Sequence, residues 1–122
     1  MSIELRNKFM KAASKYSSKI GDEEETTLIH RTSWVRILLE RLVEDSPAFS
    51  IEVEVAPPQA EKTNEEDTSW IFDKFAEHLQ YLENLRNHGF KLSVIKSGCI
   101  LCASKVIHDV PEENLFRALI PP

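Results

Sequence analysis

The chain has 122 residues, 42% of them hydrophobic and 29% charged, with a formal net charge of −5 at pH 7. This length and composition fit one globular domain over residues 1–122 and exclude low-complexity, fibrous and disulfide-framework proteins. No apolar run reaches the ~18 residues of a membrane span, the basic N-terminus lacks an apolar signal-peptide segment, and two cysteines suit a reducing compartment, so we expect a cytoplasmic protein.

The first expected helix covers residues 3–20. Its apolar side chains recur at helical spacing, and Gly21 follows its last turn. Residues 1–20 hold five basic side chains and one acidic side chain, whereas residues 21–67 hold thirteen acidic and four basic ones. The chain therefore opens basic and continues acidic.

A second helix is expected from about Thr27 to Glu44, and the Asp-Ser-Pro sequence at 45–47 ends it. Ile37 lies off its apolar stripe, among charged residues. The stripe itself consists of Leu28, Val35, Leu38, Leu39, Leu42 and Val43.

Residues 49–56 alternate strictly between apolar and polar side chains, which predicts a strand with one buried and one solvated face. The acidic stretch at 57–68, which begins with two prolines, is typical of a mobile loop. A helix over residues 69–88 follows it, and Gly89 can end this helix in left-handed backbone.

Two further strands, 90–96 and 99–107, flank a Ser-Gly turn, and a short helix follows Asp109, which forms a capping-box pattern with Glu112. The expected order is α-α-β-α-β-β-α. We therefore predict an α+β fold in which a small three-stranded sheet packs one face against the long helix. This arrangement resembles a ferredoxin-like unit that lacks its closing strand.

Cys99 and Cys102 have a CxxC spacing, with His108 close behind them. In a strand these cysteines lie about 10 Å apart on opposite faces, whereas a disulfide needs Cα atoms within about 7 Å. A zinc site usually needs a second such pair, and a redox CxxC needs a helix directly after it. We expect buried thiols in a strand and no bound metal, with a metal or redox site as the alternative.

His78 falls inside the apolar arc of the 69–88 helix, and Trp70 and Tyr81 lie at one border of that arc. Such an imidazole can line an aromatic ligand pocket as a general base or a ligand. The alternative is a histidine at the rim of the core that bonds to a backbone carbonyl.

Four lysines of the first helix form one stripe, opposite its apolar face. Like charges at this spacing destabilise an isolated helix, so an anionic neighbour would offset the cost. The candidates are the chain's own acidic segments (22–25 and 61–67) and a protein partner. Nucleic acid is not expected, because the chain is acidic overall and lacks a recognisable binding motif. Membrane binding is not expected either, because the apolar face of this helix is needed for a core and includes two alanines. The stripe consists of Lys8, Lys11, Lys15 and Lys19.

No phosphate-binding loop, nucleophile elbow, pair of catalytic carboxylates or Rossmann fingerprint occurs in the sequence. We therefore expect a small non-enzymatic protein-interaction or regulatory module that acts through its helical surface and a sheet edge, without a cofactor. The alternative is a small-molecule-binding protein or enzyme with a pocket around His78. A homodimer is also expected, because strand 99–107 carries a single charge, Lys105, and Ile37 lies off the buried stripe.

Overall fold

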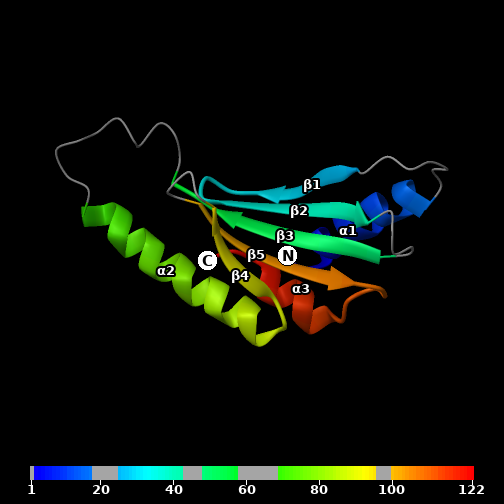
Figure 1. The fold of residues 1–122 in the computed structure, drawn as a ribbon. Helices are drawn as coiled ribbons and strands as arrows, with labels where there is room; N and C mark the ends of the chain where they lie inside the picture. Colours follow the sequence, from blue (N-terminus) through cyan, green and yellow to red (C-terminus); the bar gives the residue numbers. More distant parts are fainter. Residues whose placement is uncertain (1, 18–24, 43–47, 58–68, 96–99) are drawn as a thin grey trace.

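A computed structural model describes residues 2–17, 25–42, 48–57, 69–95 and 100–122, with residues 2, 17, 69–72, 74, 94, 95 and 100 described by their backbone alone. The described residues form a five-stranded sheet and three helices, in the arrangement that Figure 1 shows. The elements are α1 (Ser2–Ser17), β1 (Thr26–Arg31), β2 (Val35–Leu42), β3 (Ala48–Val55), α2 (Ser69–Asn87), β4 (Lys91–Ile95), β5 (Ile100–Ile107) and α3 (Glu113–Leu119).

The sheet is antiparallel throughout, with the spatial order β1-β2-β3-β5-β4. The α+β class is confirmed, but the prediction of a three-stranded sheet and the element order derived from it are wrong. β5 lies between β3 and β4, so strands 49–56 and 90–96 are not neighbours. The ferredoxin-like arrangement is therefore abandoned.

The error lies in the helix expected over residues 27–44, because the described part of that stretch, residues 27–42, belongs to the hairpin of β1 and β2. Along β2 the side chains of Val35, Ile37 and Leu39 are fully buried, and the residues between them are not. This period of two is that of a strand with one covered face. The Thr32 hydroxyl supports the tight turn by accepting hydrogen bonds from the backbone N–H groups of Trp34 and Val35, at 3.3 and 3.0 Å.

The other elements lie where their sequence patterns predicted them, within a few residues at each end. Gly89 has φ 93°, the left-handed conformation expected after the long helix. The Nζ of Lys105 donates to the His88 carbonyl at 2.6 Å, next to this turn. The capping box is wrong, because Glu112 is the N-cap of α3 and makes no side-chain capping bond. The expected turn at 97–98 and most of the loop 57–68 lie outside the described residues.

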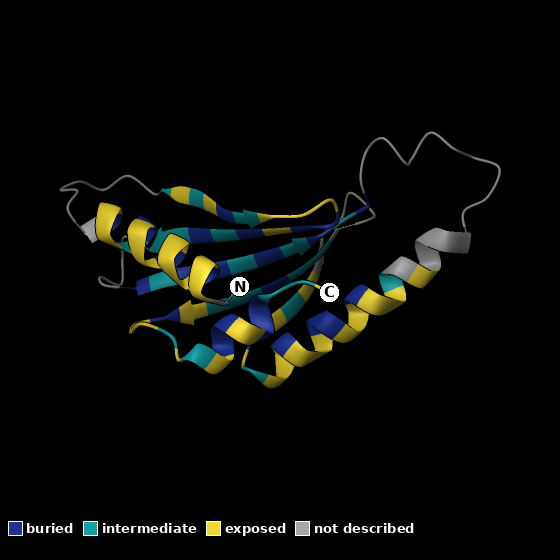
Figure 2. Ribbon diagram, turned by 180° about the vertical axis from the view of Figure 1, so that it is seen from behind, coloured by how far each residue is buried: buried dark blue, intermediate teal, exposed yellow. Residues whose placement is uncertain are grey.

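All three helices contribute to a single core on one side of the sheet. Figures 1 and 2 show α1 and α3 against the same face, with α2 beside α3. Phe9 of α1 makes edge-to-face contacts with Phe49 and Phe116, at ring-centroid distances of 6.3 and 5.6 Å. The opposite face of the sheet is covered by no described helix. None of the helices described is long and apolar enough to cross a membrane.

Candidate functional site

The structure places two of the three residues of the expected aromatic pocket in the core. His78 is buried and stacks on Trp34, with ring centroids 5.2 Å apart. The Tyr81 hydroxyl donates to the Leu119 carbonyl at 2.6 Å, and burial raises the pKa of this phenol. The side chain of Trp70 lies outside the described residues. Neither hollow described below is lined by His78 or Tyr81, so the pocket stays a prediction.

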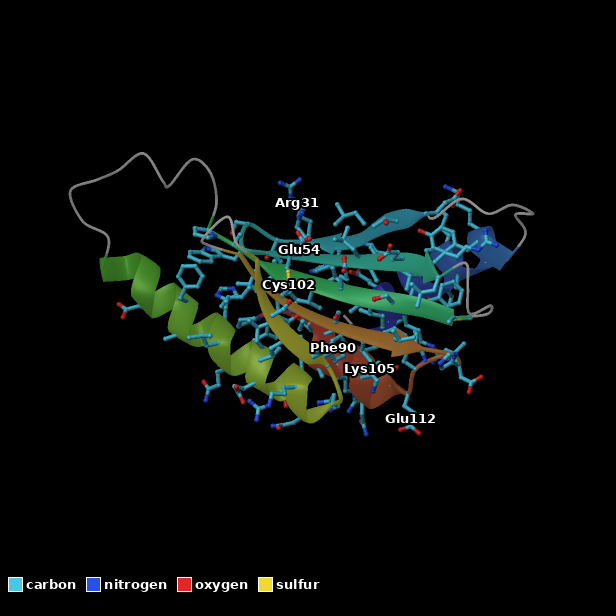
Figure 3. All side chains as sticks on the ribbon, viewed as in Figure 1. Arg31, Glu54, Phe90, Cys102, Lys105 and Glu112 are labelled. Atoms are coloured by element: carbon cyan, nitrogen blue, oxygen red, sulfur yellow. The ribbon has the colours of Figure 1, made fainter. Side chains whose placement is uncertain are left out.

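Cys102 lies in β5, as the strand interpretation requires, while Cys99 lies outside the described residues. The thiol of Cys102 is free and partly exposed on the uncovered face of the sheet. Burial, followed by the nearby Glu54 and Glu52, raises its pKa to about 11, so the thiol stays protonated at neutral pH. Figure 3 shows Cys102 and Glu54 on neighbouring strands.

An open groove of about 580 Å³ lies between α1 and the edge strand β1. Five consecutive residues of β1 line one wall. Because successive side chains of a strand point to opposite faces, a groove lined by consecutive residues follows the edge of the strand and not one face of it. The lining residues are Lys8, Lys11, Ala12, Lys15, Thr27, Leu28, Ile29, His30 and Arg31.

Helix α1 runs alongside β1 in the opposite direction. At one end the Tyr16 hydroxyl hydrogen-bonds the Thr27 hydroxyl and donates to the Leu39 carbonyl at 3.2 Å. At the other end His30 lies within electrostatic range of Lys8 and Glu4. The stretch from 8 to 16 rises ~12 Å along a helix, and that from 27 to 30 rises ~10 Å along a strand. The lysine stripe therefore follows the strand edge for most of its length.

The groove has a charge opposite to that of the whole chain. Four of its nine lining residues are cationic and none is acidic, whereas the chain has a net charge of −5. Lys8, Lys11 and Arg31 form no ion pair within the described part of the chain, and all three are exposed. Lys19, the fourth member of the predicted stripe, lies outside that part.

Among the titratable residues that line the groove, His30 has the reference pKa nearest to neutral pH. Burial lowers the pKa of its half-buried imidazole, Lys8 lowers it further, and Glu4 offsets part of the shift. The ring is therefore mainly neutral at pH 7. An anion bound beside it would raise this pKa again.

The outer edge of β1 has backbone groups that bond to no other described strand. Glu25 accepts from the Arg41 N–H at 2.9 Å, and Thr26 pairs with Glu40 and Leu28 with Leu38. In an antiparallel ladder hydrogen-bonded pairs alternate with pairs whose N–H and C=O groups point outward. Thr26 and Leu28 therefore direct their backbone groups away from β2, at the outer edge of the sheet.

Sequence reasoning identified the lysine wall of this groove but missed the opposite wall. His30, Arg31 and Leu28 were assigned to a helix, where they could not form a strand edge. A signal was present in the Thr-Ser pair at 32–33, since hydroxyl side chains form turns of this kind. The sheet edge expected from the sequence was that of strand 99–107, whereas the edge that lies beside the lysine stripe is that of β1.

Both observations behind the expected homodimer are corrected. Ile37 is fully buried in the core, and the described part of the expected strand, Ile100–Ile107, forms β5, which has a partner strand on each side. A second hollow of about 380 Å³, between α1 and the β5–α3 connection, is lined largely by apolar side chains such as Met10 and Val110. Nothing in the described residues shows what covers it.

No protein-family model, no curated protein and no solved structure matches this chain.

Proposed function

We propose that this chain is a protein-interaction module that binds a segment of a partner protein in the groove between α1 and β1. One observation carries the proposal: the basic face of a helix and the open edge of a sheet form two walls of the same groove. An exposed sheet edge binds extended segments through its backbone, and neighbouring side chains select among them.

The lining of the groove supports binding better than catalysis. It offers one imidazole, His30, and neither a carboxylate nor a thiol among its nine residues to act with it. The cations and the exposed Leu28 instead provide charge and apolar contact along a line. We also propose that the protein acts in the cytoplasm, which the free thiol of Cys102 supports.

Selection from a displayed library of random peptides tests the proposal. Peptides enriched on the wild-type chain should bind it directly, and they should lose binding to the double variant Lys8→Glu/Lys11→Glu. A matched control, Lys91→Glu/Arg86→Glu, makes the same change in net charge on exposed residues of β4 and α2. Enriched peptides that bind both variants equally, or an absence of enrichment, would contradict the proposal.

A further inference from the structure

We infer that the partner segment is an acidic chain in extended conformation, which adds to β1 as a further strand and directs alternate carboxylates toward the lysines of α1. This inference rests on the proposed function and specifies its ligand. It follows from three features of the groove: the backbone edge, the spacing of the cations and the position of Leu28.

The backbone edge provides the first requirement. Thr26 and Leu28 direct N–H and C=O groups away from β2, as the pairing of β1 with β2 shows, and Leu28 also lines the groove. These groups are spaced two residues apart, the repeat of an antiparallel or parallel ladder. An extended segment satisfies them in register, whereas a helical ligand has used its own backbone groups within the helix.

The spacing of the cations provides the second. Lys8, Lys11 and Lys15 follow one another at about 4.5–6 Å along the axis of α1. Alternate side chains on one face of a strand are ~6.8 Å apart. Because α1 and β1 lie side by side, an added strand with an acid at every second position can place successive carboxylates near successive lysines.

Leu28 sets the other half of the pattern. It pairs with Leu38 on the uncovered face of the sheet and is 47% exposed. Residues of the added strand between the acids point to that same face, where an apolar or β-branched side chain can cover Leu28. The segment that fits is thus acid, apolar, acid, apolar, with regular pairing along Thr26–Leu28, because a bulge between Leu28 and His30 interrupts the register of β1.

The surroundings of the groove favour a peptide over a larger polyanion. The uncovered face next to β1 contains Glu40, Glu52 and Glu54 on β2 and β3. Their carboxylates would repel the phosphates of a nucleic acid or a lipid surface that extends beyond the groove. A single strand seated between α1 and β1 presents its charge to a groove whose lining holds four cations and no acidic residue.

Fluorescence anisotropy with labelled ten-residue peptides at low salt tests the inference on the full chain. The alternating Glu-Val peptide should bind, and a peptide of the same composition with its five glutamates in one block should bind about tenfold more weakly. Methylation of the backbone nitrogens at one alternate set of positions should remove binding, and methylation of the other set should not, because only one set faces β1. Gel filtration of the peptides alone excludes self-association.

The charge side of the test uses variants that keep the fold, checked by circular dichroism. Lys8→Gln/Lys11→Gln should weaken binding of the alternating peptide about tenfold, and Lys91→Gln/Arg86→Gln should leave it unchanged. Equal binding of both methylated peptides would overturn the inference, because the contact would then be charge alone. Tighter binding of a single-stranded oligonucleotide or of phosphatidylserine vesicles, lost in the same variant, would overturn it in favour of those anions.

The two proposals can fail separately. Library peptides that bind through the groove but are neutral or wholly apolar would preserve the proposed function and overturn the acidic strand. A library that yields no groove-dependent peptide, together with no binding of the alternating peptide, would overturn both.

Discussion

The groove between α1 and β1 and the uncovered face of the sheet are both charged. The uncovered face carries charges of both signs, whereas the residues that line the groove carry charges of one sign. On the uncovered face Arg36 forms an ion pair with Glu54 from the neighbouring strand, with an Nε–Oε2 distance of 3.0 Å. The pKa of Glu52 is raised by burial and by Glu40 and Glu54. In the groove the lining charges have one sign.

This difference separates charge that the fold neutralises from charge that it leaves available. Cross-strand pairing on the uncovered face lowers the net charge of each neighbourhood, which suits a surface facing water. Lys8 and Lys11 gain nothing of this kind from β1, since Arg31 and His30 add cationic or neutral groups. A surface that keeps a repulsive set of charges beside an open strand edge is the better candidate for a partner.

The largest expected effect separates the two faces of β2. Leu39 is fully buried under the helices, whereas Leu38 is partly exposed on the other face. Leu39→Ala should lower the free energy of unfolding by ~2–5 kcal/mol, and Leu38→Ala by less than ~1.5 kcal/mol. Urea denaturation measures both. Equal losses would mean that the uncovered face is a second core and not a surface that faces water.

The second prediction concerns the chemistry of the uncovered face. The pKa of Cys102 is raised to about 11 by burial and by Glu54 and Glu52. In a Cys99→Ser background, Cys102 should react with a maleimide or disulfide reagent at pH 8 roughly 10- to 100-fold more slowly than a free cysteine peptide. The rate should rise when urea unfolds the chain. A native rate equal to the peptide's would show that the acidic face does not control this thiol.

A smaller effect compares paired and unpaired cations. Arg36→Gln removes the partner of Glu54 and should lower the free energy of unfolding by up to ~1 kcal/mol. Lys11→Gln relieves repulsion within α1 and should leave stability unchanged or raise it by roughly a few tenths of a kcal/mol. Thermal denaturation at low salt measures both changes. A clear loss of stability in Lys11→Gln would show that the fold already neutralises the groove.

The smallest expected effect is the pH response of His30. Its folded-state pKa is lowered, by burial first and then by Lys8, with Glu4 opposing, so the unfolded chain binds the proton more strongly. The contribution of His30 to stability is therefore present above its unfolded pKa and is lost as the pH falls through the folded value. Solvent screens this half-buried ring, so the effect is modest.

His30→Gln should consequently lose slightly less stability than the wild type between pH 7.5 and pH 5.5, values chosen to bracket the histidine pKa of about 6.5. Denaturation midpoints at the two pH values provide the measurement. A variant with the same or a steeper loss would show that burial and Lys8 do not lower the pKa of this ring.

The sequence predicted those elements whose periodicity has one interpretation. Residues 49–56 alternate without exception, and the 69–88 segment keeps its apolar residues on one helical arc, so β3 and α2 were identified within a few residues. Adjacent apolar pairs such as Leu38-Leu39 satisfy both a helical stripe and a two-sided strand. With no glycine or proline in the turn at 32–34, leucine content favoured the helix.

Of the two walls of the groove, only the lysine wall could be predicted from the sequence. The lysine stripe depends only on spacing within one helix, which the sequence contains. The opposing wall depends on which strand occupies the sheet edge, and that is decided by pairing among segments distant in the chain, such as β3 with β5. The position of His78 on the apolar arc of its helix was readable from the sequence, and the ring is buried. Its stacking on Trp34 was not predictable, because Trp34 comes from a segment that was expected to be a helix.

Amide hydrogen exchange of the full chain, followed by NMR with and without the alternating acidic peptide, tests the central claim most directly. The outward-facing amides of Thr26 and Leu28 should exchange about tenfold or more slowly with peptide bound, because they then donate to an added strand. The amides of β4, the other edge strand, should not change. Slowed exchange in β4 with none at Thr26 and Leu28, or peptide binding without any slowed amide, would contradict strand addition at β1.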